Sequence, residues 1–369
     1  MSINFSSFDP AQSFQQTICT QFSETFSRKS SKKIAHIVKP EAGCSGFTFL
    51  CSLVDIESSS NNIVNFILKW SQPDSSKSQV LCSRLFDFFQ CSAPKIVEVP
   101  PRESQALKRI AQRVSPALES SDYSLVFMKA FKATTFKSCI ELGYFDDLTK
   151  SEQKKIWTHL GETILFDLIT GNNDRLFRFD DKGDLKVHFN SGNIMLEVPY
   201  NEDGTRRVLR QIHLIDNDTD RNILKDFSTK EEDEEDFCLE IGAVHERILA
   251  VTPDAKKLQS EQWLNTLKNV TIRPKKLLKY ATAGVSRAFI QAIPPKSTFK
   301  LPKASFLQGC LKKGFQKGMD QIKACKEDEL YAKLLNDKEK IDDPSELLNF
   351  VRKCIGVIKS GGRSDFSGN

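Results

Sequence analysis

The stretch GFTFLCSLVDIESSSNNIVNFILKW, residues 46–70, decides how the first part of the chain folds. Two runs rich in β-branched and aromatic residues are joined by the turn-rich segment ESSSNN. This pattern is typical of two antiparallel strands connected by a turn. We therefore predict a β-hairpin, whose second strand carries Lys69 in an otherwise apolar run. A charge in such a place needs a partner.

The segments around the hairpin extend a β-rich unit over residues 34–130. KIAHIVKP before the hairpin and APKIVEVP and YSLVFMKAF after it read as further strands. SKSQVLCSRLFDFFQ and RESQALKRIAQRV carry apolar residues at helical spacing. Residues 1–33 are rich in Ser, Gln and Phe, and we expect them to form a flexible leader.

The remainder of the chain, residues 131–369, is predicted to be mostly helical. KKIWTHLGETILFDLIT forms an amphipathic pattern that stops at Gly171, a residue type common at helix C-termini. Further helical patterns cover residues 237–251, 258–269, 274–292, 304–324 and 327–357. Together they predict an α+β fold with two lobes, a β-rich N-lobe and a mostly helical C-lobe, and the 27 Phe residues predict a Phe-rich core.

Cysteine and hydropathy patterns argue against several classes of protein. The ten Cys residues include no CxxC pair and no neighbouring His at metal-ligand spacing, which argues against a zinc site and a disulfide framework. No apolar run reaches the roughly 18 residues of a membrane span. Residues 1–22 lack the features of a Sec signal peptide. HExxH and GxSxG are absent, so a metalloprotease or serine hydrolase has no support.

The net charge of +5 hides an uneven distribution. Residues 273–326 contain 13 Lys or Arg residues and one acid, Asp320, whereas KEEDEEDF at 230–237 is acidic. The basic segment is either the solvated face of helices or a binding surface for a polyanion, such as an inositol phosphate or an anionic lipid. No pattern of basic and stacking residues indicates nucleic-acid binding.

Several residues match the needs of phosphoryl transfer, in which a protein positions phosphates and a metal ion and orients the attacking hydroxyl. Gly43, Ser45 and Gly46 precede a strand, where small residues let backbone amides approach phosphate oxygens. Lys69, one hairpin further on, would neutralise phosphate charge. Taken alone, Gly43, Ser45 and Gly46 are more typical of a plain turn, and Lys69 is as typical of an edge strand as of a phosphate site.

Three more candidates follow later in the chain. Asp174 comes after the long helix in NNDR, where a carboxylate can orient or deprotonate a hydroxyl. Asn193 lies in GNIM, and Asp216 follows the alternating run QIHLI at the tip of a predicted strand. An amide oxygen and a carboxylate are suitable magnesium ligands. Each piece alone fits an ordinary turn, whereas the ordered set favours a nucleotide site.

The ordered set NNDR … GNIM … LIDND resembles the catalytic segment of the protein-kinase-like superfamily. It is most similar to the actin-fragmin kinase family, which is related to the phosphatidylinositol kinases. GCSGFTF, FILKW and a helix followed by APK fit the same pattern, so that the resemblance covers about residues 40–220. It implies a protein Ser/Thr kinase that uses ATP and Mg²⁺, with actin or an actin-associated protein as a candidate substrate.

The resemblance also implies roles for single residues: ATP-phosphate contact for Lys69, catalytic base or acceptor orientation for Asp174, and magnesium binding for Asn193 and Asp216. Backbone groups of the hinge VFMKAF would line the adenine slot, at Phe127, Met128 and Lys129. Arg175 would be structural. We expect a cytoplasmic location. The leader, the lack of a Sec signal and the divergence from typical kinases also suit an effector that a bacterium secretes into the cytoplasm of a host cell.

One departure concerns the partner of Lys69. The following helix should offer a Glu, but Gln79 stands at the expected place and cannot neutralise an ammonium; Glu103 is the other candidate partner. A pseudokinase that binds partners without turnover therefore stays open. So do a lipid or inositol-phosphate kinase, which the basic segment favours, and a kinase-like effector that transfers AMP.

Overall fold

The computed structural model describes residues 3–4, 32–38, 47–55, 63–99, 101–113, 115, 118, 123–172, 174–179, 185–218, 253–295, 299–335 and 346–361. Within this part of the chain the structure is α+β, with helices predominating. None of the helices described is both long enough and apolar enough to cross a bilayer. The acidic run at 230–237 and the predicted helix at 237–251 lie outside the described residues.

The largest sheet has six strands in the order β1-β2-β3-β4-β6-β5, and all neighbours are antiparallel. Its strands are β1 (Ile3–Asn4), β2 (Lys32–Val38), β3 (Phe47–Asp55), β4 (Ile63–Ser71), β5 (Ile96–Glu98) and β6 (Ser124–Lys129). β3 and β4 form the predicted hairpin, with Phe47 opposite Trp70. β1 pairs with β2, so residues 3–4 of the segment predicted to be a flexible leader belong to the sheet.

Helices take up most of the rest. They are α2 (Pro73–Phe88), α3 (Pro101–Gln112), α4 (Phe136–Glu141), α5 (Lys150–Thr170), α7 (Pro253–Ile272), α8 (Lys275–Ala292), α9 (Ala304–Ala324), α10 (Glu327–Leu334) and α11 (Glu346–Lys359). The helices predicted at 258–269, 274–292 and 304–324 are confirmed as α7, α8 and α9. The helical segment predicted at 327–357 contains α10 and α11, but it is not continuous, because α10 ends at Leu334 with an extended residue after it.

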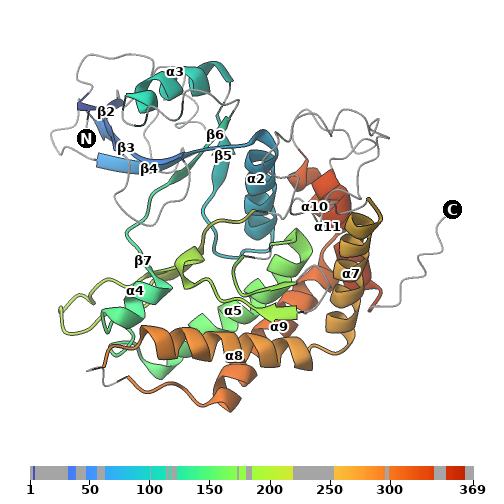
Figure 1. Ribbon diagram of the computed structural model, residues 1–369. Helices are drawn as coiled ribbons and strands as arrows, with labels where there is room; N and C mark the ends of the chain where they lie inside the picture. The colour runs from blue at the N-terminus through green and yellow to red at the C-terminus, as the bar shows by residue number, and fades with distance from the viewer. Residues whose placement is uncertain are drawn as a thin grey trace, which may run out of the picture.

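Two small sheets accompany the helices. β7 (Thr134–Thr135), β10 (Ile194–Glu197) and β11 (Gln211–Leu214) form one in the order β11-β10-β7, and β8 (Phe177–Phe179) pairs with β9 (Leu185–Val187) in the other. Figure 1 shows the six-stranded sheet and α3 at one end of the molecule, α4, α5, α8 and α9 at the other end, and α2 between them.

Each end has a buried apolar cluster of its own. The sheet cluster contains the aromatic residues Phe49, Phe66, Trp70 and Phe127. The larger cluster surrounds α5 and includes Phe136, Phe145, Trp157 and Phe289. The ring centroids of Phe136 and Phe289 lie 5.3 Å apart. Burial of one such ring stabilises the fold by about 1.5–3 kcal/mol. Packing at both ends thus accounts for the Phe residues that belong to these two clusters.

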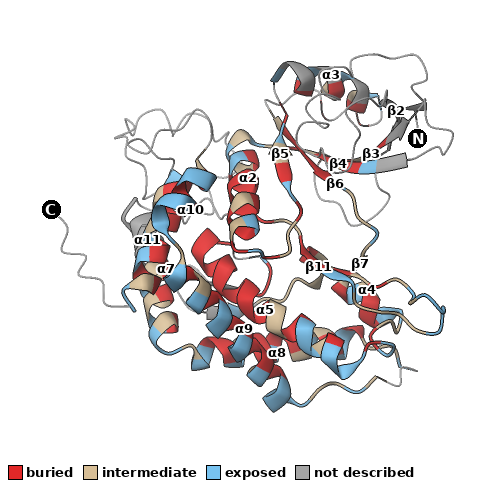
Figure 2. Ribbon diagram, turned by 180° about the vertical axis from the view of Figure 1, so that it is seen from behind, coloured by how far each residue is buried: buried red, intermediate tan, exposed pale blue. Residues whose placement is uncertain are grey.

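Helix α5 is the centre of the helical end, and Figure 2 shows it buried along most of its length. It begins with a capping box, in which Thr149 accepts a bond from the Glu152 amide and the Glu152 carboxylate accepts one from the Thr149 amide at 2.8 Å. It ends at Gly171 with φ +68°, as the sequence predicts. Glycine adopts this left-handed conformation without steric cost.

The contact between α5 and α9 depends on glycine. A Cβ at Gly161 of α5 would lie 2.2 Å from the carbonyl oxygen of Leu311, and one at Gly314 of α9 would lie 1.7 Å from that of Thr158. No side chain fits at either position. The two backbones therefore touch, and residues next to the glycines on the two helices are brought close together.

Candidate functional site

Strand pairing brings two of the predicted motifs together. β10 and β11 are antiparallel with Ile194 opposite Leu214, and the Ile215 amide donates to the Asn193 carbonyl at 3.1 Å. Asn193 directly precedes β10, and Asp216 comes shortly after β11. Both side chains thus belong to the same edge of the small sheet.

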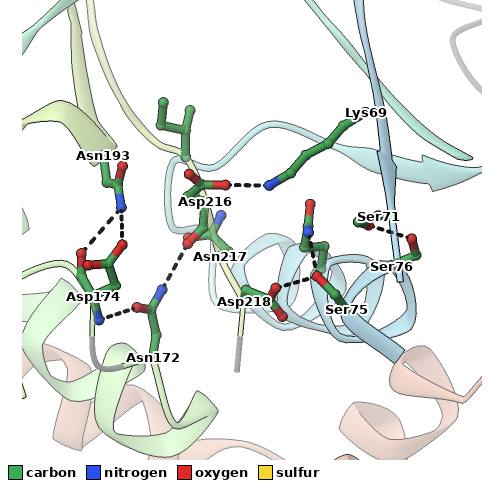
Figure 3. A network of polar contacts seen from close by, with 12 residues as sticks. Lys69, Ser71, Ser75, Ser76, Asn172, Asp174, Asn193, Asp216, Asn217 and Asp218 are labelled. Carbon is green, nitrogen blue, oxygen red and sulfur yellow. Dashed lines mark hydrogen bonds and ion pairs between the residues drawn. The ribbon is translucent and has the colours of Figure 1, made fainter. Parts of the chain in front are cut away.

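Lys69 contacts this edge from strand β4 of the six-stranded sheet. Its ammonium lies 2.6 Å from a carboxylate oxygen of Asp216, a residue 147 positions away in the chain (Figure 3). The side chains of Lys69 and Asp216 are 19% and 40% exposed, so neither charge is fully removed from water. The charge in the apolar strand has its partner in Asp216.

Asp174 is bonded to Asn193. The amide nitrogen of Asn193 donates to the backbone carbonyl and to the carboxylate of Asp174, each at 3.2 Å (Figure 3). His188 and Asn190 contact the same carboxylate at 2.9 and 3.4 Å. The Asp174 side chain is 62% exposed, so the carboxylate that the sequence assigns to hydroxyl orientation is open to a ligand.

The side chain of Asn172 connects Asp174 with Asp216. It donates to the Asp216 carbonyl at 3.1 Å and accepts from the Asp174 amide at 3.0 Å (Figure 3). Asp216 has φ +54°, in the left-handed region that residues other than glycine seldom adopt. The bond from buried Asn172 therefore helps to hold a conformation that costs free energy, and such conformations cluster at functional sites.

Arg175 ties α5 to the segment after β11. It is fully buried, and its guanidinium donates to the Asp167 carboxylate, to the Ile215 carbonyl at 2.8 Å and to the side-chain oxygen of Asn217. Burial raises the pKa of the Asp167 carboxyl to about 7, and the Arg175 guanidinium opposes that shift. These bonds fix the backbone on both sides of Asp216, which fits the structural role implied for Arg175.

Helix α2 carries Gln79, the expected partner of Lys69. Gln79 is buried and donates to the Ser75 hydroxyl at 3.1 Å, and Ser75 donates in turn to Asp218. The structure thus does not bring Gln79 to Lys69, whose ammonium is paired with Asp216. Glu103 lies on α3, and its side chain is outside the described part of the structure.

The predicted hinge residues Phe127, Met128 and Lys129 end strand β6, which lies beside β4. The side chains of the first two are buried and that of Lys129 is exposed. After them the chain leaves the six-stranded sheet and reaches β7, which belongs to the same small sheet as β10, the strand that follows Asn193. The hinge residues therefore lie where the chain passes from one end of the molecule to the other. Gly43, Ser45 and Gly46 lie outside the described residues.

Other polar residues that support this cluster were missed at the sequence level: Ser75, Asn172, His188, Asn190, Asn217 and Asp218. Asn172, Asn217 and Asp218 stand inside NNDR and LIDND, so the motifs themselves contained a signal for them. His188 and Asn190 belong to a segment between β9 and β10 without a recognisable pattern.

The oxygen atoms of the cluster suit a hard divalent cation. Asn193 uses its amide nitrogen for Asp174, which leaves its Oδ1 to act as a ligand, and Asp216 has a second carboxylate oxygen besides the one at Lys69. Mg²⁺ is commonly held by one or two protein carboxylates together with substrate phosphates and water. The described His, Cys, Asp and Glu side chains form no group of three or more that could hold a metal ion.

No protein-family model matches the chain, and no curated protein matches it at a significant level. The functional assignment therefore rests on the residues of this site and on the order in which they occur.

Proposed function

We propose that the chain is an ATP- and magnesium-dependent kinase with a bilobal, protein-kinase-like fold, which transfers the γ-phosphate of ATP to a Ser or Thr hydroxyl of a protein. The observation that carries the proposal is the meeting of Lys69 with Asp216 and of Asp174 with Asn193 at one sheet edge. All four belong to the ordered set that the sequence selects. A separate buried cluster at each end of the molecule supports the two-lobe arrangement.

Each side chain has a role that its contacts support. Lys69 would exchange Asp216 for phosphate oxygens, since an ammonium binds either anion. Asp174 would accept a hydrogen bond from the acceptor hydroxyl and take its proton as oxygen bonds to the γ-phosphorus and the bond to ADP breaks. His188, 2.9 Å from the Asp174 carboxylate, would hold that carboxylate in position.

Asn193 and Asp216 would hold Mg²⁺ through an amide oxygen and a carboxylate oxygen. The ion, when bound, neutralises charge on the phosphates. The bonds from Asn172 to the Asp216 carbonyl and from Arg175 to the Ile215 carbonyl set the direction of the Asp216 side chain before any ligand binds. Such pre-organisation of charged groups is the main source of electrostatic catalysis.

The substrate class follows from the resemblance alone, so actin is the first substrate to test. The full chain is incubated with Mg²⁺ and ATP labelled in its γ-phosphate, together with monomeric actin, filamentous actin or actin bound to a severing protein. Vesicles that contain phosphoinositides form a separate lipid arm. Mass spectrometry of the product distinguishes an added phosphate from an added AMP.

Matched variants make this test specific. Asp174→Asn and Asp216→Asn should lower transfer by at least about a hundredfold, the usual cost of removing a catalytic charge. Asp147→Asn changes an exposed carboxylate and should leave transfer unchanged. Circular dichroism confirms that all three variants fold. Equal transfer by the wild type and both site variants would show that the assignment is wrong.

A pseudokinase is the second candidate, because Gln79 stands where the resemblance expects a Glu and is bonded to Ser75. In that case Mg²⁺-ATP would raise the melting temperature of the wild type, and Lys69→Met would remove the shift. No substrate would be labelled in any arm. Labelling that depends on Asp174 removes this candidate.

A further inference from the structure

A cavity of about 500 Å³ shares no lining residue with the cluster around Asp216. It is formed by α5, α9, the turn after α2, and strand β11 with the residues just before it. Five basic side chains line it: Lys154, Lys155, Arg210, Lys313 and Lys317. Among the described residues that line it, Glu162 is the one acid.

The sequence builds this concentration of charge from two distant helices. Lys154, Lys155 and Glu162 lie on one face of α5, and Lys313 and Lys317 lie one turn apart on α9. The glycine contact between the helices brings the two faces together, since Gly314 directly follows Lys313 and meets the backbone at Thr158. The CLKKGFQKG segment thus combines a packing requirement with a basic face.

The acid in the cavity is already engaged. Glu162 is buried, its carboxylate contacts the Lys317 ammonium at 2.6 Å, and His159 lies 3.6 Å away. Burial raises the pKa of Glu162, but its contacts and charge interactions with His159 and Lys317 outweigh that effect and hold the pKa below its usual range. Glu162 is therefore a carboxylate at neutral pH that orients Lys317.

In the described part of the chain, the other four cations of the cavity are paired less closely with carboxylates than Lys317 is. Arg210 lies 3.8 Å from Glu197, and the described residues offer no carboxylate within 4 Å of Lys154, Lys155 or Lys313. Even with Glu197 counted, the five cations exceed the carboxylates by three. Unbalanced like charges that face one cavity repel each other, so an anionic ligand would be bound favourably.

We infer that this cavity binds a compact polyphosphate, of the kind found in inositol polyphosphates and in phosphoinositide headgroups. One phosphate carries about −1.5 to −2 charges near neutral pH, so two or more phosphates are needed to balance three cations. Ser92, Thr158 and Gln211 add hydroxyl and amide donors. No described Phe, Tyr or Trp lines the cavity, which favours a ligand without a stacking base. The inference does not depend on the proposed kinase activity.

Titration calorimetry of the full chain with inositol hexakisphosphate tests the soluble source, and flotation with vesicles that contain phosphatidylinositol bisphosphate tests the lipid source. The cavity variant is Lys154→Ala with Lys155→Ala and Lys313→Ala, three exposed residues whose removal leaves Glu162 paired. It should weaken binding by roughly a hundredfold, the effect of removing three cations from an anion site.

The matched control is Lys275→Ala with Lys276→Ala and Lys279→Ala, which removes the same charge from exposed positions of α8 in the basic segment. It should retain the affinity, as should Lys69→Met at the candidate site. Cavity-dependent binding of either probe supports the inference and identifies the source. Equal losses in both triple variants, loss in Lys69→Met, or no saturable binding of either probe would overturn it.

Discussion

Two ion pairs hold the short segment 215–217, one of them formed by Asp216 itself, and they differ in how far they are exposed to water. Arg175 and Asp167 are 0% and 1% exposed, and Arg175 also bonds Ile215 and Asn217, so its partners are all protein groups. Lys69 and Asp216 are 19% and 40% exposed, and among the described residues Asp216 is the one partner of the Lys69 ammonium. The difference separates a pair that holds the backbone from a pair whose exposure to water fits the exchange of a protein partner for a ligand that the proposed function requires.

The largest effect on stability is expected at the buried pair. Arg175→Met should lower the free energy of unfolding by about 3–5 kcal/mol, because Asp167 and Asn217 would keep buried polar groups without a partner. Urea unfolding followed by circular dichroism measures the loss. Arg273→Met, at an exposed position, is the control and should stay within about 0.5 kcal/mol of the wild type. A similar loss of unfolding free energy in both variants would show that the buried Arg175–Asp167 pair does not stabilise the fold as proposed.

A smaller loss is expected at Asn172, which joins the two sides of the cluster. Asn172→Ala leaves the Asp216 carbonyl and the Asp174 amide without their bonds and should cost about 1–3 kcal/mol. Asn201→Ala removes side-chain bonds from a partly exposed turn and serves as the comparison in the same unfolding experiment. If Asn201→Ala lowers the free energy of unfolding as much as Asn172→Ala does, the burial of Asn172 does not explain its contribution to stability.

Next in size is the backbone conformation of Asp216. Asp216→Gly and Asp216→Ala both lose the contact with Lys69, but only glycine adopts φ +54° without strain. Asp216→Gly should therefore be more stable than Asp216→Ala by about 1 kcal/mol. In most other positions alanine is the more stabilising of the two. A higher melting temperature for the alanine variant would contradict the assigned strain.

The smallest change in stability is expected at Lys69. Lys69→Met removes a partly exposed ion pair and should alter the free energy of unfolding by less than about 1 kcal/mol. Under the proposed function the same variant should lower phosphate transfer by about a hundredfold or more. Both are measured on one preparation, and a large stability loss with intact transfer would reverse the interpretation of the two ion pairs.

The parts of the fold that the sequence predicted are those with local causes. The hairpin over residues 46–70 follows from residue types and a polar turn, and the end of α5 follows from Gly171. The break between α10 and α11 had a local signal as well, since Pro344 disfavours a continuous helix, but the prediction over 327–357 overlooked it.

Contacts between segments that are distant in the chain limit how much of the site the sequence can predict. Lys69, Asp174, Asn193 and Asp216 could be selected because each lies in or beside a recognisable apolar run. The orientation of Gln79 depends on Ser75 and on Asp218, which is 143 positions further on than Ser75, and no local pattern contains that contact. The basic cavity likewise requires Gly161 and Gly314 to bring two helices together, which charge counting along residues 273–326 could not reveal.

The three tryptophans give the molecule built-in fluorescent reporters. Trp70 belongs to the sheet cluster and Trp157 to the larger cluster around α5. Trp263 of α7 donates to the Leu168 carbonyl of α5 at 2.9 Å. All three are buried, so each emission spectrum will shift to longer wavelength when its own surroundings admit water. Variants that retain one indole at a time would therefore reveal whether the sheet end and the helical end melt as one cooperative unit or in succession.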